Sequence, residues 1–546
     1  MIARLLVVVA LVVAVLSPLR AAHAHIGHDR PKLELGKRPP APKEGPRGRA
    51  ALSPHGKPVA LTRTADGSYV GGFEIKNTGD GPLQIYRVGV RNADDGGAKP
   101  PVGLGIQTLP KASTILPPGE SRLYNVVWRP DQTNVTQAFA QVVVDTDSAA
   151  PGASAYDPPL YLGVVADRRP LPLRHILAVA LLLPLLLAGL AFASRYQPAG
   201  GERALRAASV AVGLACIVAS ALPLFGFLRG VGRDDGNDGL QFIERGSVLG
   251  FDVFLGVDGL TAPLLPVPAM VFLACALATH DGKLARFCLL AAPMAAAATL
   301  LLAAQSLPLL AFALAATALL GGMIATSRSA SGKLGAGSFK LLTGGAIASG
   351  SFALLTHYLA RSTPGVIGLD GLPSELAWNL PDVARELSHG HVETGTVLGL
   401  PASHGLFVLA VVTAAALSFA APFHRVGAEV ARESDASDAT MAIALYSLAG
   451  GFVLLRFGVL LSPDAARWGA PALATIGVVT LVGAVARAAI EDDLRGLAGV
   501  LPSATGGAMW LMASSLTPQG TQGAIAIALA RPVAAALLLL TAGALV

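Results

Sequence analysis

Charged residues and cysteines are scarce in this chain. Only 14% of its 546 residues are charged and three are cysteines, whereas 53% are hydrophobic. The mean hydropathy of +0.58 is too high for a chain that is solvated by water throughout. The cysteines fall in or beside apolar runs, so they support neither a disulfide framework nor a clustered metal site; they are Cys216, Cys275 and Cys288. The composition predicts a membrane protein.

Sequence motifs for redox chemistry are also absent. The chain has no recognisable flavin, nucleotide or iron-sulfur motif, so we predict no cofactor and no redox reaction of its own. The formal net charge is +6, but many lysines and arginines fall in a proline-rich arm and in short loops. We interpret these as solvated loops and topology signals, with the lipid bilayer and no nucleic acid as partner.

The N-terminal segment predicts export. Residues 1–24 combine the basic Arg4, an apolar run and the cleavage-like triplet "AHA", as in a signal peptide. An uncleaved anchor is the alternative, because Arg20 lies close to the cleavage site. Residues 25–57 are rich in proline and basic residues and predict a disordered linker.

Residues 58–167 change to an alternation of apolar and polar residues. The runs "SYVGGFEIKN", "LQIYRVGVRN", "SRLYNVVWRP" and "QAFAQVVVDT" are separated by turn signals, which predicts a β-sandwich of about seven strands. The order of these runs resembles immunoglobulin-like domains of bacterial envelope proteins. No acid pair, nucleophile or phosphate loop stands out here, so we expect a binding or spacer module that contacts an envelope partner.

Residues 168–546 predict an all-α polytopic membrane bundle, which makes the fold class mixed. Spans of this length suffice to cross the hydrocarbon core. Basic loops alternate with an acidic one, so the positive-inside rule places the β-sandwich on the periplasmic side of a bacterial inner membrane. About eleven apolar spans are expected, at residues 176–194, 207–228, 254–279, 285–303, 307–326, 337–360, 404–423, 439–461, 470–488, 497–514 and 521–546.

A series of motifs in this region resembles one respiratory family. The segment "LQFIERGSVLGFDVFLGVDGLTAPLL", followed in order by "FKLLTGGAIASG", "LSFAAPFH", "FVLLRFG" and "DDLRGLAGVLPSATGG", is similar to the M-type antiporter-like membrane subunit of NADH:quinone oxidoreductase, complex I. The resemblance covers roughly residues 176–546. It implies a proton-translocating, quinone-linked assembly of several subunits. The family continues beyond the eleventh span, so the chain is expected to be C-terminally truncated relative to it.

The resemblance also implies where a proton path should run. The family uses a glutamate in its fifth helix, lysines in its seventh and eighth, and a histidine in its tenth. These positions fall here at alanine, leucine and threonine, none of which carries a proton; they are Ala315 or Ala316, Ala420, Leu448 and Thr505. We therefore expect the proton path to have decayed.

Four charged or titratable residues remain as weak ion-pathway candidates: Lys340, His357, Arg456 and Arg531. Ionisable groups inside a membrane are costly and often functional. A structural role is the alternative for each, since long basic side chains near span ends reach the interface, and arginine does not relay protons by deprotonation.

Two further residues are structural signatures of the resemblance. Asp258 stands at the head of a span with several prolines and is expected to cap that helix. Pro422 stands where the family breaks its seventh helix.

A loop with two closely spaced histidines is a weak metal candidate. His389 and His391 lie between Glu386 and Glu393 and could bind zinc or copper, although the loose spacing favours a solvated loop. We predict no metal for the chain.

Three hypotheses for function follow. The first is a non-redox membrane subunit of a complex I-like assembly without its own proton path. The second is a non-enzymatic membrane scaffold that displays the outward domain, and the third is a cation/proton antiporter subunit.

Overall fold

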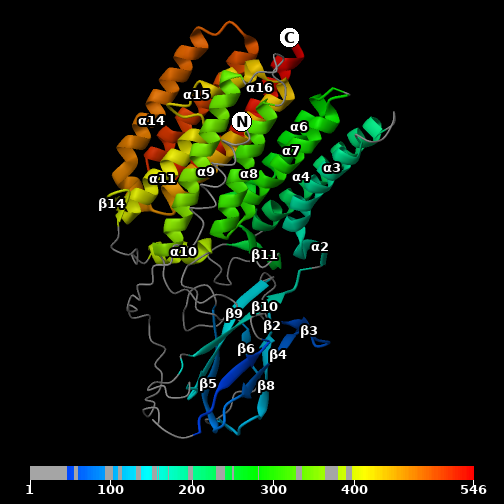
Figure 1. Cartoon of the computed structure of the whole chain (residues 1–546), viewed down its shortest axis with the longest axis vertical. Coiled ribbons are helices and arrows are strands. Elements are labelled where there is room, and N and C mark those ends of the chain that lie inside the picture. The colour runs from blue at the N-terminus through cyan, green and yellow to red at the C-terminus, as the bar shows by residue number, and fades with distance from the viewer. Residues whose placement is uncertain are drawn as a thin grey trace.

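A computed structural model shows a β-rich domain at one end of a helical bundle (Figure 1). The predicted signal peptide lies outside the residues that the structure describes, as do residues 25–45 of the predicted linker. The described residues are 46–54, 59–92, 103–107, 114–130, 137–149, 157, 159–169, 171–194, 201–228, 240–248, 251–280, 282–326, 335–362, 379–388 and 396–545.

The β-rich domain contains two five-stranded sheets. One has the order β1-β4-β8-β6 with β3 also paired to β4, and the other has the order β2-β10-β9-β5-β7. The strands are β1 (Ala50–Ser53), β2 (Val59–Ala60), β3 (Thr62–Arg63), β4 (Tyr69–Asn77), β5 (Leu83–Asn92), β6 (Leu104–Ile106), β7 (Thr114–Leu116), β8 (Ser121–Trp128), β9 (Gln137–Thr146) and β10 (Leu160–Asp167).

Both sheets contribute to one hydrophobic core. Strand β4 buries every second residue, which is the period-two pattern that the sequence predicted. Trp128 is fully buried and packs on Tyr69 with ring centroids 5.3 Å apart. Strands as short as β2 and β3, of two residues each, raise the strand number above the seven or so expected. The immunoglobulin-like topology stays a prediction.

The first strand, β1, begins at Ala50, within the segment that was predicted to be a disordered linker. Strand β1 lies within residues 25–57 and pairs antiparallel with β4, with Ala50 opposite Asn77. Its sequence, "AALS", has no proline or charge, so it can complete a sheet edge although the residues before it are proline-rich.

The second part of the chain is a bundle of helices with two small hairpins. The helices are α2 (Leu171–Arg174), α3 (Ile176–Ser194), α4 (Gly201–Leu228), α5 (Thr261–Leu264), α6 (Val267–Ala278), α7 (Leu284–Ala303), α8 (Leu307–Thr326), α9 (Ala336–Ser362), α10 (Leu380–Ser388), α11 (Ala402–Leu417), α12 (Val426–Glu433), α13 (Ala436–Val453), the π-helix η1 (Leu454–Leu460), α14 (Pro463–Ala489), α15 (Leu494–Ser514) and α16 (Pro518–Leu545). The hairpins are β11 (Gln241–Val248) with β12 (Phe251–Val257), and β13 (Thr396–Val397) with β14 (Leu400–Pro401).

Nine helices of the described part are long and apolar enough to cross a membrane. The predicted count of about eleven spans is not confirmed. The predicted span 404–423 corresponds to α11, which ends at Leu417 and, with 16 residues, is shorter than each of the nine candidate spans. The predicted span 497–514 corresponds to α15, whose apolar residues are diluted by glycine and hydroxyl residues.

The predicted third span, residues 254–279, begins as a strand and not as a helix. Residues 254–257 belong to β12 and pair with β11. Helix α5 starts only at Thr261, and Pro266 separates it from α6 because proline has no N–H to donate. Hairpin β11–β12 lies between the β-rich domain and the bundle (Figure 1).

The helix that was predicted to break at Pro422 is discontinuous in the structure. Helix α11 ends at Leu417, and α12 starts at Val426. Phe419 between them has a φ of 52°, which ends the helical path. In the turn, the N–H of Ala421 donates to the Thr480 hydroxyl at 2.8 Å.

Candidate functional site

Asp258 lies directly before α5, at the end of the bundle that carries the hairpin β11–β12. Its Oδ1 accepts hydrogen bonds from the N–H groups of Leu260 at 3.0 Å and Thr261 at 2.9 Å. The N–H of Asp258 in turn donates to the Thr261 hydroxyl at 3.0 Å. This reciprocal arrangement satisfies donors that the first helical turn leaves free.

The other oxygen of Asp258 forms an ion pair with Arg456. Arg456 projects from the π-helix η1, and both side chains are largely buried, at 18% and 14% exposed. A second hydrogen bond, 3.5 Å long, joins Arg456 to Gln305, whose amide donates to the Gly256 carbonyl at 3.1 Å. Arg456 is therefore held in a polar cluster. Neither the pair nor Gln305 had a signal in the sequence, because the residues are 198 and 151 positions apart.

Arg531 lies deep in the bundle, beside the break that follows α11. It is 2% exposed, and its terminal NH2 donates to the Ser418 carbonyl at 3.1 Å. Trp510 donates to the Ser418 hydroxyl at 3.1 Å. Among the described residues, Nε and the second terminal nitrogen of Arg531 have no hydrogen-bond partner. A cation at the carbonyl end of a helix is stabilised by the helix dipole, so Arg531 completes the end of α11.

The remaining candidates lie away from the interior. Lys340 is 48% exposed and pairs with Glu429 of α12 at 2.7 Å. His357 is half-buried on α9 and packs edge-on against Tyr358, with ring centroids 5.9 Å apart. Pro422 is exposed within the break. No element brings Lys340, His357, Arg456 and Arg531 together into one path.

At three of the positions where the resemblance implied protonatable residues, the side chain is apolar or is hydrogen-bonded within its own helix. Ala420 and Leu448 are buried, and the Thr505 hydroxyl donates to the Leu501 carbonyl of its own helix at 2.9 Å. The buried Tyr446 donates to the Ala318 carbonyl of α8. An added Cβ at Gly345 would lie 2.6 Å from the Tyr446 hydroxyl, so this ring fills the space between α8, α9 and α13.

The sequence did not single out His424, which lies in the break before α12. Its Nδ1 is buried and has no hydrogen-bond partner among the described residues, and its carbonyl accepts from Ser503 at 2.9 Å. His389 and His391 lie outside the described residues. Within the described part, no group of three or more histidine, cysteine, aspartate or glutamate side chains could hold a metal ion.

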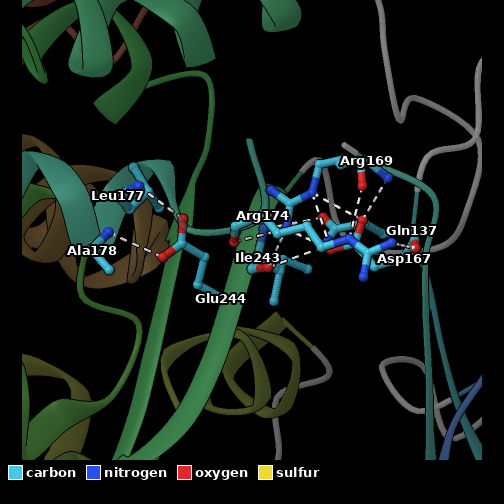
Figure 2. A network of polar contacts seen from close by, with 8 residues as sticks. All are labelled: Gln137, Asp167, Arg169, Arg174, Leu177, Ala178, Ile243 and Glu244. Carbon is cyan, nitrogen blue, oxygen red and sulfur yellow. Dashed lines mark hydrogen bonds and ion pairs between the residues drawn. The ribbon is translucent and has the colours of Figure 1, made fainter. Parts of the chain in front are cut away.

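A second polar cluster joins the β-rich domain to the bundle (Figure 2). Gln137 of β9 exchanges two hydrogen bonds with the backbone of Ile243 in β11, at 2.9 and 3.1 Å. Arg169 donates to the Ile243 carbonyl at 2.9 Å and forms an ion pair with Asp167 at 2.8 Å.

Glu244, the next residue, extends this cluster to α3. Its two oxygens accept from the N–H groups of Leu177 at 2.8 Å and Ala178 at 3.0 Å, in the first turn of α3 (Figure 2). Burial raises the pKa of Glu244, although these N–H groups and the nearby Arg169 and His175 oppose the shift. The sequence had placed Glu244 only in an acidic outer loop.

The chain resembles chains of two solved respiratory complexes. One is respiratory complex I from Thermus thermophilus with bound NADH, with a TM-score of 0.52 and 22% identity over 68% of this chain and 71% of that chain. The other is the membrane-bound sulfane sulfur reductase, an archaeal respiratory membrane complex, with a TM-score of 0.51 and 16% identity over 68% of this chain and 56% of that chain. The chain has a fold found in respiratory membrane complexes.

At these low sequence identities, the similarity establishes the fold only. It does not establish the chemistry of this chain. No family model matches the sequence, and no curated protein matches it. With nine candidate spans in its described part, the chain is a multi-pass membrane protein.

Proposed function

We propose that this chain is a membrane subunit of a respiratory-type complex that does not conduct protons by itself. The fold supports the assembly half of the proposal. Descent from the M-type subunit of complex I is part of the proposal and rests on the motif series from "LGVDG" to "VLPSATGG".

One observation carries the non-conducting half. A proton path needs groups that bind and release protons inside the bilayer. Within the described bundle, the side chains of Arg531, Trp510 and Ser418 fill the break after α11. The Tyr446 ring fills the space between α8, α9 and α13. The hydroxyls of Thr317 and Ser447 donate to carbonyls of their own helices at 2.8 Å.

Proton flux through the purified full chain tests this half. Proteoliposomes with an entrapped pH dye are energised by a potassium diffusion potential, and protein-free liposomes set the baseline. We expect the flux to equal the baseline until an uncoupler is added. Flux above the baseline that falls on Lys340→Ala or His357→Ala would contradict the proposal and favour the cation/proton antiporter hypothesis.

Isolation of the native complex tests the assembly half. The chain is extracted from its own membrane under mild conditions, and the proteins that migrate with it are identified. Respiratory subunits in stoichiometric amount support the proposal. A chain that migrates alone, or only with envelope proteins, would instead support a membrane scaffold.

The scaffold hypothesis has one observation in its favour. The β-rich domain is bonded to the bundle through its own side chains, as Figure 2 shows, so the two parts meet as a built interface. A scaffold of this kind presents a binding domain on the side of the membrane that we propose to be periplasmic.

A further inference from the structure

The start of hairpin β11–β12 departs from a regular ladder. The pairing shifts between Gln241, which lies opposite Val257, and Glu244, which lies opposite Leu255. Phe242 takes a φ of 54°, an uncommon conformation for a residue with a bulky side chain. A β-bulge of this kind turns backbone groups away from the partner strand, and here it turns those of Ile243 outward.

The groups that the bulge turns outward are satisfied by the β-rich domain. The side-chain amide of Gln137 both donates to and accepts from the backbone of Ile243, as a neighbouring strand would. Unpaired backbone groups buried without partners are costly, so this match stabilises the contact. Arg169 adds a charged donor, and its guanidinium lies 5.7 Å from the centre of the Phe242 ring.

Apolar packing reinforces the same contact. Val165 of β10 packs against a cluster formed by Leu240, Ile243 and Phe254 of the hairpin. On the bundle side, the Phe242 ring lies over Gly226 of α4, where an added Cβ would lie 2.6 Å from the ring.

The same short segment also holds α3 through Glu244. Residues 241–244 therefore bond or pack against β9, β10, α3 and α4 at once. Arg169 is only 5% exposed at this contact, and its charge is compensated there by Asp167 of its own segment.

We propose that this bulge is a docking site for the chain's own β-rich domain and that the joint holds the domain in one orientation over the bundle. The β-rich domain and the bundle then move as one body. The proposal does not depend on proton conduction or on respiratory partners.

Distance measurements between spin labels test the joint in the full chain, reconstituted in lipid nanodiscs. Labels are attached at Leu123→Cys of the β-rich domain and Leu398→Cys of the bundle, whose native side chains are 65% and 61% exposed. The native cysteines are buried, and a chain without the two new cysteines controls for their labelling. We expect one narrow distance distribution.

Substitution of the joint should broaden that distribution. The variants are Gln137→Ala with Arg169→Ala, and the single substitution Gln137→Glu. The latter removes a donor and places a carboxylate against the Ile243 carbonyl and the Asp167 carboxylate. Lys76→Ala, at an exposed position of β4 away from the joint, is the control and should leave the distribution narrow. A broad distribution in the unsubstituted chain, or a narrow one in both joint variants, would overturn the proposal.

Discussion

At the scale of single residues, the two carboxylate oxygens of Asp258 make different contacts. One oxygen caps α5 and the other pairs with Arg456. Removal of one member of a buried pair leaves a charge without compensation, so we expect Arg456→Leu to lower the free energy of unfolding by about 3 kcal/mol. Asp258→Asn keeps a cap acceptor and should recover part of this loss in the Arg456→Leu background.

Denaturation in mixed micelles measures these free energies of unfolding. The double-mutant cycle should give a coupling energy above about 0.5 kcal/mol, as groups in contact do. Strictly additive losses would show that the pair does not form in the membrane.

The Arg531 guanidinium occupies the space that a side chain at position 506 would need. An added Cβ there would lie 3.1 Å from the guanidinium and 3.1 Å from the Ser418 carbonyl. We expect Gly506→Ala to cost about 1–3 kcal/mol of stability through overpacking. Gly350→Ala is the matched control, because nothing lies within 4 Å of that position and alanine favours a helix.

The comparison is made by thermal unfolding of both variants in the same detergent. Gly350→Ala should be neutral or stabilising. Arg531→Gln should relieve the effect of Gly506→Ala, and an unchanged penalty in that double variant would place the strain elsewhere.

Glu244 predicts a pH dependence of stability. Because burial raises its pKa above the ordinary 4.5, the folded state binds this proton more tightly than the unfolded state does. The stability it contributes is complete below pH 4.5 and is lost as the pH rises through the raised pKa. Relative to Glu244→Gln, the wild type should therefore lose thermal stability as the pH is raised from 4.5 to 7. Parallel melting temperatures across this range would refute the assignment.

At the scale of elements, α12 is joined to α9 by two sets of bonds of unequal strength. Glu433 accepts from the N–H groups of Gly337 at 2.9 Å and Ser338 at 3.1 Å, which caps α9. The Lys340–Glu429 pair is more exposed, because its lysine is 48% exposed. We expect Glu433→Ala to cost about 1 kcal/mol as a lost cap, and Lys340→Met less than about 0.5 kcal/mol as an exposed pair.

Unfolding of the two variants side by side provides the measurement. The prediction is that Glu433→Ala loses more free energy of unfolding than Lys340→Met does. A larger loss for Lys340→Met would mean that the pair is shielded from water, and would return Lys340 to consideration as a pathway residue.

At the scale of the whole molecule, the sequence predicted what depends on periodicity and length. The alternation in β4 and the apolar runs from α3 to α16 are local properties, and the discontinuity near Pro422 came from a motif. The joint at Ile243 and the Asp258–Arg456 pair could not be predicted, because they connect segments 106 and 198 residues apart. The predicted start of the third span at residue 254 was too early. The apolar run there belongs to β12, and the periodicity of such a short run does not distinguish a strand from a helix.

The carboxylate that caps α3 bears on the order in which the protein is made. Helix α3 takes its cap from Glu244, which is 67 residues later in the chain than Leu177. The first turn of α3 therefore lacks this acceptor until residue 244 has been synthesised. The cap of α3 and the contact between hairpin β11–β12 and the β-rich domain can form only after that point.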